Sequence, residues 1–217
     1  MMRFKHLFST VIVVLFAVVL AACSHHTLVE SKKDSTGYTP DPATEYLVTQ
    51  YADATGVQGT FYTITNDTTL IIIYAAPDGI TIDAVYDNGF DYDFIEAAGE
   101  PYDDITVMET YHTLTRDASN VTHLHRGDVL SICGLTFSVL NAYDDTVLQN
   151  VGDEKDYQNN ASLLLKVSSA NSSMLFCSDI KYDMNDSLLA ACKDQLACDY
   201  VQTGHHGNWS FSEEFSD

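Results

Sequence analysis

Basic residues are scarce in this chain. Only 10 Lys and Arg stand against 31 Asp and Glu in 217 residues, which gives a formal net charge of −21. Proteins that bind phosphate backbones over a broad surface depend on Lys and Arg. The composition therefore excludes an extended nucleic-acid-binding surface, and it weakens contact with anionic lipid headgroups. A small metal site that acts on a phosphodiester remains compatible with this acidity.

Cysteines are few, and their spacing does not match a zinc ribbon. Cys133 and Cys177 lie in apolar runs, where buried free thiols are common. Cys192 and Cys198 flank an expected helix end and an expected strand start. Four cysteines allow three pairings, and the sequence leaves open whether any disulfide forms.

No apolar run reaches the length of about 20 residues that a bilayer span requires. The longest run, residues 7–20, follows Arg3 and Lys5 and is followed by Ala-Ala-Cys23. A charged start, an apolar stretch and small residues predict a signal peptide over residues 1–22. The end of this segment resembles the lipobox of bacterial lipoproteins, which implies that Cys23 carries the lipid. An ordinary signal peptide and an uncleaved anchor are the alternatives.

The remainder divides into a polar tether over residues 23–45 and one domain over residues 46–217. The tether is rich in polar residues and prolines, which favour an extended linker. The resulting protein is expected outside the cytoplasm, held to a bacterial membrane through Cys23.

The first half of the domain is predicted to be rich in short strands. Residues 59–65 and 68–74 form a hairpin around Asn66 and Asp67, and residues 80–86 form a third strand. Residues 103–115 show helical periodicity. Three further short strands are expected in apolar runs that turns separate: residues 121–125, 129–133 and 135–140.

The second half predicts a strand, helix and strand in succession. A polar loop over residues 141–160 precedes a hairpin formed by residues 162–167 and 173–177. Asn185 or Asp186 is expected to cap a helix that ends at Asp194. A last strand covers residues 198–202. The expected fold class is α/β, with two sheets layered with helices.

Acidic and imidazole side chains follow two of these strands. Ser178 and Asp179 come after one strand, and Gly204-His205-His206-Gly207 comes after the last. Strand ends are where open α/β sheets place their chemistry, and carboxylate and imidazole are zinc ligands. The pattern indicates half of a metal site. Alternatively, Asp179 caps a helix and the histidines lie in a polar loop.

The order of these motifs resembles the second half of a metallo-β-lactamase-fold hydrolase. The resemblance rests on Asn159-Asn160-Ala161-Ser162-Leu163, on Ser178-Asp179 after a strand, and on the Gly-His-His-Gly segment. It extends over residues 121–215 and is strongest to the C-terminal domain of ComEC-type DNA-uptake competence proteins. It implies an αββα sandwich and a metal-dependent hydrolase, of phosphodiesterase or nuclease type.

The resemblance also implies roles for individual residues. Asp179 would be a metal ligand, with His205 as terminal ligand and His206 as second choice, and the metal would be zinc or manganese. Ser178 stands where relatives carry Gly. Asn160 lies near the position of a further His ligand, so one metal position is altered.

The first half of the chain departs from this family. The main metal motif, His-x-His-x-Asp-His, is absent, and the chain looks internally deleted near Tyr74 and shortened after Asp217. His123 and His125 lie on one face of a strand but lack the rest of the motif, so they are expected to be half-exposed strand residues. An impaired hydrolase is therefore expected, with a non-catalytic remnant or a binding lipoprotein as the alternative.

Overall fold

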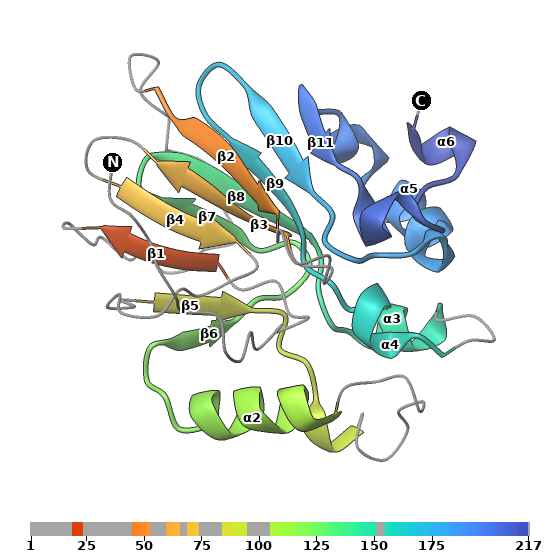
Figure 1. Ribbon diagram of the computed structural model, residues 1–217. Helices are drawn as coiled ribbons and strands as arrows, with labels where there is room; N and C mark the ends of the chain where they lie inside the picture. The colour runs from red at the N-terminus through yellow and green to blue at the C-terminus, as the bar shows by residue number, and fades with distance from the viewer. Residues whose placement is uncertain are drawn as a thin grey trace.

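The structure, a computed structural model, has the mixed α/β class that the sequence predicts. Helices accompany two sheets, each containing both parallel and antiparallel strands (Figure 1). The residues that the structure describes are 19–23, 45–52, 60–65, 69–73, 84–94, 105–150 and 155–216. The predicted turn at Asn66 and Asp67 and most of the predicted signal peptide and tether lie outside them.

The larger sheet has six strands in the order β2-β3-β4-β1-β5-β6. These strands are β1 (Val19–Cys23), β2 (Leu47–Ala52), β3 (Thr60–Thr65), β4 (Thr69–Ile73), β5 (Ala84–Asp87) and β6 (Val121–His123). The predicted hairpin is confirmed, because β3 and β4 pair antiparallel with Tyr62 opposite Ile73. Strand β1 lies between β4 and β5 and pairs antiparallel with both.

The smaller sheet has five strands in the order β11-β10-β9-β8-β7. These strands are β7 (Val129–Ile132), β8 (Leu135–Asn141), β9 (Leu164–Ser168), β10 (Ser173–Phe176) and β11 (Tyr200–Gln202). Strands β7 to β10 are successive antiparallel neighbours, whereas β10 and β11 are parallel. The connection between β10 and β11 contains α5 (Asn185–Leu196), so the chain forms the strand–helix–strand unit that the sequence predicts.

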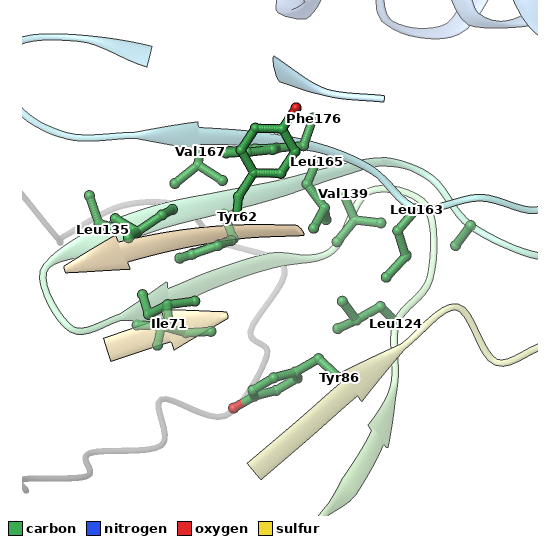
Figure 2. Close-up of a cluster of buried hydrophobic side chains, with 14 residues drawn as sticks. Tyr62, Ile71, Tyr86, Leu124, Leu135, Val139, Leu163, Leu165, Val167 and Phe176 are labelled. Carbon is green, nitrogen blue, oxygen red and sulfur yellow. The ribbon is translucent and has the colours of Figure 1, made fainter. Parts of the chain in front are cut away.

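The two sheets share one core. Alternate residues of each strand point to the same side, and in each sheet one such set packs against the other sheet. In Figure 2, Tyr62 and Ile71 of the larger sheet face Val167 and Phe176 of the smaller one. The Tyr62 and Phe176 rings meet edge to face, with centroids 5.2 Å apart. Phe176 is fully buried and therefore joins the two sheets directly.

A second core forms on the other face of the smaller sheet. Leu140, Leu164 and Leu175, which alternate with the residues of the shared core, pack against Leu188 of α5. This packing fixes α5 over the smaller sheet, while α2 (Ile105–Thr115) lies beside β5 and β6 (Figure 1). The C-terminal helix α6 (Glu213–Ser216) lies next to α5.

Two predictions about the second half are wrong. The segment 141–160 is not a plain loop, because it contains α3 (Asp145–Gln149) and α4 (Tyr157–Asn160). Each of these helices is capped by an aspartate, Asp144 for α3 and Asp156 for α4, so the acids that suggested a loop begin helices. Neither Asn185 nor Asp186 caps α5, whose N-cap is Met184 without a side-chain hydrogen bond.

Two further points concern cysteines and membrane spans. Cys177, Cys192 and Cys198 are free thiols, and burial raises the pKa of Cys177 well above that of an exposed thiol.

Within the part of the chain that the structure describes, no helix has the length and apolar character needed to cross a bilayer.

We expect Phe176→Ala to lower the free energy of unfolding by about 3–5 kcal/mol, because it leaves a cavity between the sheets. Urea titration followed by circular dichroism measures this loss. Leu114→Ala is the control, since Leu114 is an exposed helix residue, and its effect should stay within about 0.5 kcal/mol. Equal losses in the two variants would contradict the assignment of Phe176 to the shared core.

Candidate functional site

The parallel strands β10 and β11 carry the candidate site at their carboxyl ends. Phe176 is the register partner of Gln202, so the segments that follow these residues leave the sheet side by side. One segment contains Ser178 and Asp179, and the other contains His205 and His206. The predicted placement of the acid and the histidine pair at one sheet edge is therefore what the structure has.

The side chain of Gln202 joins the two segments. Its Oε1 accepts hydrogen bonds from the backbone N–H groups of Cys177 and Ser178, both at 2.8 Å. Its Nε2 donates to the carbonyl oxygens of Ser178, at 3.3 Å, and Thr203, at 2.5 Å. The backbone N–H of His205 also donates to the Ser178 carbonyl at 3.0 Å. These bonds hold the acid-bearing segment against the histidine-bearing one.

Three residues of the site have left-handed backbone conformations. The φ angles are +50° at Ser178, +43° at His205 and +57° at His206. A side chain in this region costs roughly 1–2 kcal/mol per residue, and such residues gather at functional sites. The angle at Ser178 explains physically why glycine suits this position, as the resemblance implied.

Gly204 is required for a different reason. A Cβ atom at this position would lie 2.8 Å from the carbonyl oxygen of Ile180, which is a backbone atom and cannot move aside cheaply. Only glycine allows the turn η2 (Gly204–Gly207) to approach Ile180 this closely. The first glycine of the Gly-His-His-Gly segment thus places the histidines close to Asp179.

The structure brings Asp179 together with His206 rather than with His205. Asp179 Oδ1 lies 3.5 Å from His206 Nε2. His205 Nδ1 instead lies 2.6 Å from the carbonyl oxygen of Asn208. His206 is therefore the histidine in contact with Asp179, whereas the resemblance implied His205 as the terminal metal ligand. Asp179 also does not cap a helix, because the turn η1 (Tyr182–Met184) has Lys181 as its N-cap.

Burial dominates the electrostatics of Asp179. It raises the pKa of this carboxyl above its usual range, although the two histidines act in the opposite direction. Asp156 adds to the rise, because its negative charge lies near Asp179. Asp156 is itself paired with Lys181, whose Nζ lies 3.1 Å from Asp156 Oδ2, and both side chains are buried. A positive charge close to Asp179 would therefore stabilise the ionised form of its carboxyl group.

Polar groups below the site fix its position. The Asp179 N–H donates to Ser162 Oγ at 3.3 Å, and the Lys181 N–H donates to Asn160 Oδ1 at 3.3 Å. Asn160 is fully buried, and its Nδ2 lies 3.4 Å from Asp183 Oδ2. Asn160 therefore supports the backbone of the Asp179 segment.

Sequence reasoning missed Asp87, which contacts the exposed His123. His123 Nδ1 lies 2.5 Å from Asp87 Oδ1, and Tyr111 donates to Asp87 Oδ2 at 2.6 Å. Burial and the charge of Asp87 raise the pKa of Tyr111 above its usual value. His123 is the last residue of β6 and His125 lies beyond the strand, so the strand is shorter than predicted; both histidines are exposed rather than half-exposed. No local signal reveals Asp87, because its partners are remote in sequence.

The distances at the site can be compared with those of a metal centre. Two ligands on one tetrahedral zinc lie about 3.3 Å apart, since each bond is about 2.0–2.1 Å long. The separation of 3.5 Å between Asp179 and His206 fits a shared metal as well as an ion pair. Over the described ranges, however, no group of three His, Cys, Asp or Glu side chains is placed to hold a metal ion.

Comparison of the chain with protein-family models, curated proteins and solved structures gave no match.

We expect glycine to be more stable than alanine at position 178 by roughly 1 kcal/mol, because only glycine adopts a φ of +50° without strain. Ser178→Gly and Ser178→Ala both lack the hydroxyl group. The difference in their stability therefore reports the backbone strain of a non-glycine residue at this φ angle. Thermal or urea unfolding measures the difference.

The same alanine and glycine pair at Ala170 is the control for this comparison. Ala170 is exposed in a turn and is not among the residues with a positive φ. Glycine should therefore be the less stable residue there, by roughly 0.5–1 kcal/mol. The same preference at both positions would rule out backbone strain at Ser178.

We expect Asp179→Asn to stabilise the protein more at neutral pH than at acid pH. A raised pKa in the folded state means that the contribution of Asp179 to stability is full below its unfolded pKa and is lost as the pH rises through its folded pKa. The amide does not ionise, so the advantage of the variant grows over that range. Urea unfolding across the pH range measures this advantage.

The exposed Asp194 provides the matched control, with Asp194→Asn measured at the same pH values. A benefit of Asp179→Asn that is equal at acid and neutral pH would show that burial of the charge at Asp179 is not its cause.

Proposed function

We propose that this chain is a lipid-anchored extracytoplasmic protein of the metallo-β-lactamase-fold hydrolase lineage. In this proposal Asp179 and His206 are the remaining half of a metal site for zinc or manganese, with His205 beside them. The lipid on Cys23 would hold the domain at the membrane. The activity would be phosphodiesterase-like or nuclease-like, weakened by the absence of the main metal motif.

The single observation that carries the proposal is the approach of Asp179 Oδ1 to His206 Nε2, at 3.5 Å, across two adjacent strand ends. Three separate features serve this approach: the Gln202 hydrogen bonds, the left-handed backbone and the close packing of Gly204. Strained backbone of this kind persists where a site depends on it. The arrangement of two sheets around one core, with α5 on the outer face of one of them, supports the αββα sandwich of the proposed lineage.

A bound metal would lower the pKa of a coordinated water and polarise the scissile group. The residues of this chain would contribute the rest. Asp179 and His206 would hold the ion. The buried ion pair of Asp156 and Lys181 would keep these two charged side chains in fixed positions near it. The strong acidity of the chain favours small substrates over long nucleic acids.

We expect the purified protein to bind zinc or manganese and to hydrolyse bis-p-nitrophenyl phosphate slowly. Asp179→Ala and His206→Ala should each weaken metal binding by about tenfold or more, since even loss of a group that orients a ligand has an effect of this size. His205→Ala should have a smaller effect, because its Nδ1 faces Asn208. Isothermal titration with the metal and the rate of p-nitrophenolate release are the measurements.

His125→Ala is the control for nonspecific binding by exposed imidazole. Equal losses in His125→Ala and His206→Ala would contradict a site at Asp179. Metal at background level and no turnover would support the alternative, which is a non-catalytic remnant or a binding lipoprotein.

A further inference from the structure

Two exposed aromatic side chains, Tyr182 and Trp209, lie side by side next to the candidate site. Tyr182 is 46% exposed and Trp209 is 65% exposed. Their ring centroids are 5.8 Å apart, and the two ring planes are inclined by 36°. Large aromatic side chains are highly buried on average, so an exposed pair of this kind needs an explanation. We call the pair the aromatic platform.

The aromatic platform is carried by the same two segments as the candidate site. Tyr182 follows Asp179 by three residues, and Trp209 follows His206 by three residues. Three residues of chain span at most roughly 10–11 Å, so both rings are attached close to the side chains proposed to hold the metal. The Tyr182 N–H donates to the carbonyl oxygen of Trp209 at 2.8 Å, which joins the two segments beyond the site.

The backbone on both sides of Trp209 is fixed. His205 Nδ1 lies 2.6 Å from the carbonyl oxygen of Asn208. Ser210 is buried, and its Cβ atom would lie 3.5 Å from a Cβ atom at Gly204. A side chain on such a backbone loses little freedom when a ligand binds to it, which favours binding.

The backbone of Trp209 is also strained, since its φ angle is +54°. A left-handed conformation is a genuine outlier for a bulky residue. Glycine would relieve the strain, and a polar side chain would suit the exposed position better. Tryptophan therefore brings neither a relaxed backbone nor a buried ring to this position. Strained residues of this kind gather at ligand-binding sites, which points to a ligand for the indole ring.

The spacing of the two rings favours a planar ligand that stacks on an outer face of the aromatic platform. A third ring inserted between them would require a centroid separation of about 7 Å, twice the spacing of about 3.4 Å between stacked bases. The observed 5.8 Å is too short for this insertion. Bases of every kind stack on exposed aromatic side chains. The scarcity of Lys and Arg excludes a long strand, so a single nucleotide unit fits best.

We propose that the aromatic platform binds the base of a small phosphodiester in which one phosphate joins a nucleoside to a second alcohol. The base would stack on Trp209, with Tyr182 supporting the indole ring from the other side. The phosphodiester would then lie at Asp179 and His206. This proposal rests on the hydrolase activity proposed above and names the class of its substrate.

Trp209 is the only tryptophan of the chain, so intrinsic tryptophan fluorescence reports on the aromatic platform alone. The purified protein is titrated with adenosine in the presence of EDTA. Adenosine has a base but no phosphate, so its binding does not require a metal. We expect saturable quenching of the fluorescence. Ribose, which lacks the base, should cause no quenching.

Variants that lack tryptophan are compared by following the proton NMR signals of adenosine in a titration. Trp209→Leu should weaken adenosine binding by about tenfold or more, whereas Trp209→Phe retains a ring and should keep most of the affinity. Tyr200→Leu is the matched control, because Tyr200 is also 65% exposed but is not part of the aromatic platform. It should bind adenosine as the parent does. Circular dichroism checks that each variant is folded.

Absence of quenching by adenosine, or equal losses in Tyr200→Leu and Trp209→Leu, would overturn the proposal. A blue shift of the fluorescence with phosphatidylcholine vesicles, without a response to adenosine, would also overturn it and would assign the aromatic platform to membrane contact. Metal at background level with adenosine binding retained would contradict the metal site at Asp179 and leave the base-binding role of Trp209 intact. The two proposals therefore fail separately.

Discussion

Two buried amides hold the sheets in register at the edge that carries the site. Asn141 Nδ2, at the end of β8, donates to the carbonyl oxygens of Asn160 and Ser162 at 2.9 and 2.8 Å. Asn88 Nδ2, next to the end of β5, donates to the carbonyl oxygen of Ala161 at 2.8 Å. The segment before β9 is thus bound by one side chain from each sheet. A buried carbonyl without such a partner costs about 1–3 kcal/mol, so these bonds dictate where the segment lies. Ser162 in turn receives the N–H of Asp179.

The geometry of the site is therefore set by hydrogen bonds to the backbone and by backbone packing. Interactions between the ionisable groups themselves do not determine it. The Gln202 side chain joins the two segments, and Gly204 permits the close approach to Ile180. The burial that raises the pKa of Asp179 is a cost of this placement, and a positive charge near the carboxyl would offset it. A protonated His206 or a metal ion would supply that charge. The separation of the two side chains accommodates either, and metal titration distinguishes them.

The sequence reveals the parts of this fold that depend on local patterns. Alternating apolar runs predict the β3–β4 hairpin and the strands of the smaller sheet, because burial on one or both faces leaves a periodic trace. The placement of Asp179 and the histidine pair at one edge follows from the strand–helix–strand order. Other features depend on contacts between remote residues. Three features require tertiary neighbours that periodicity does not encode: the pairing of His123 with Asp87, the contact of His206 with Asp179 and the helices within residues 141–160.

Strand β1 presents the sharpest contrast between local pattern and tertiary role. Its residues are apolar and small, which suits both the end of a signal peptide and a strand in the middle of a sheet. Local composition does not separate these roles, since membrane insertion and sheet burial both select aliphatic side chains. The two roles have opposite consequences for the larger sheet, which is continuous with β1 and divided without it. The smaller sheet has its own second core under α5 and receives the Asp179 and His206 segments directly. The candidate site is therefore built on the part of the molecule whose strand pairing does not depend on residues 1–22.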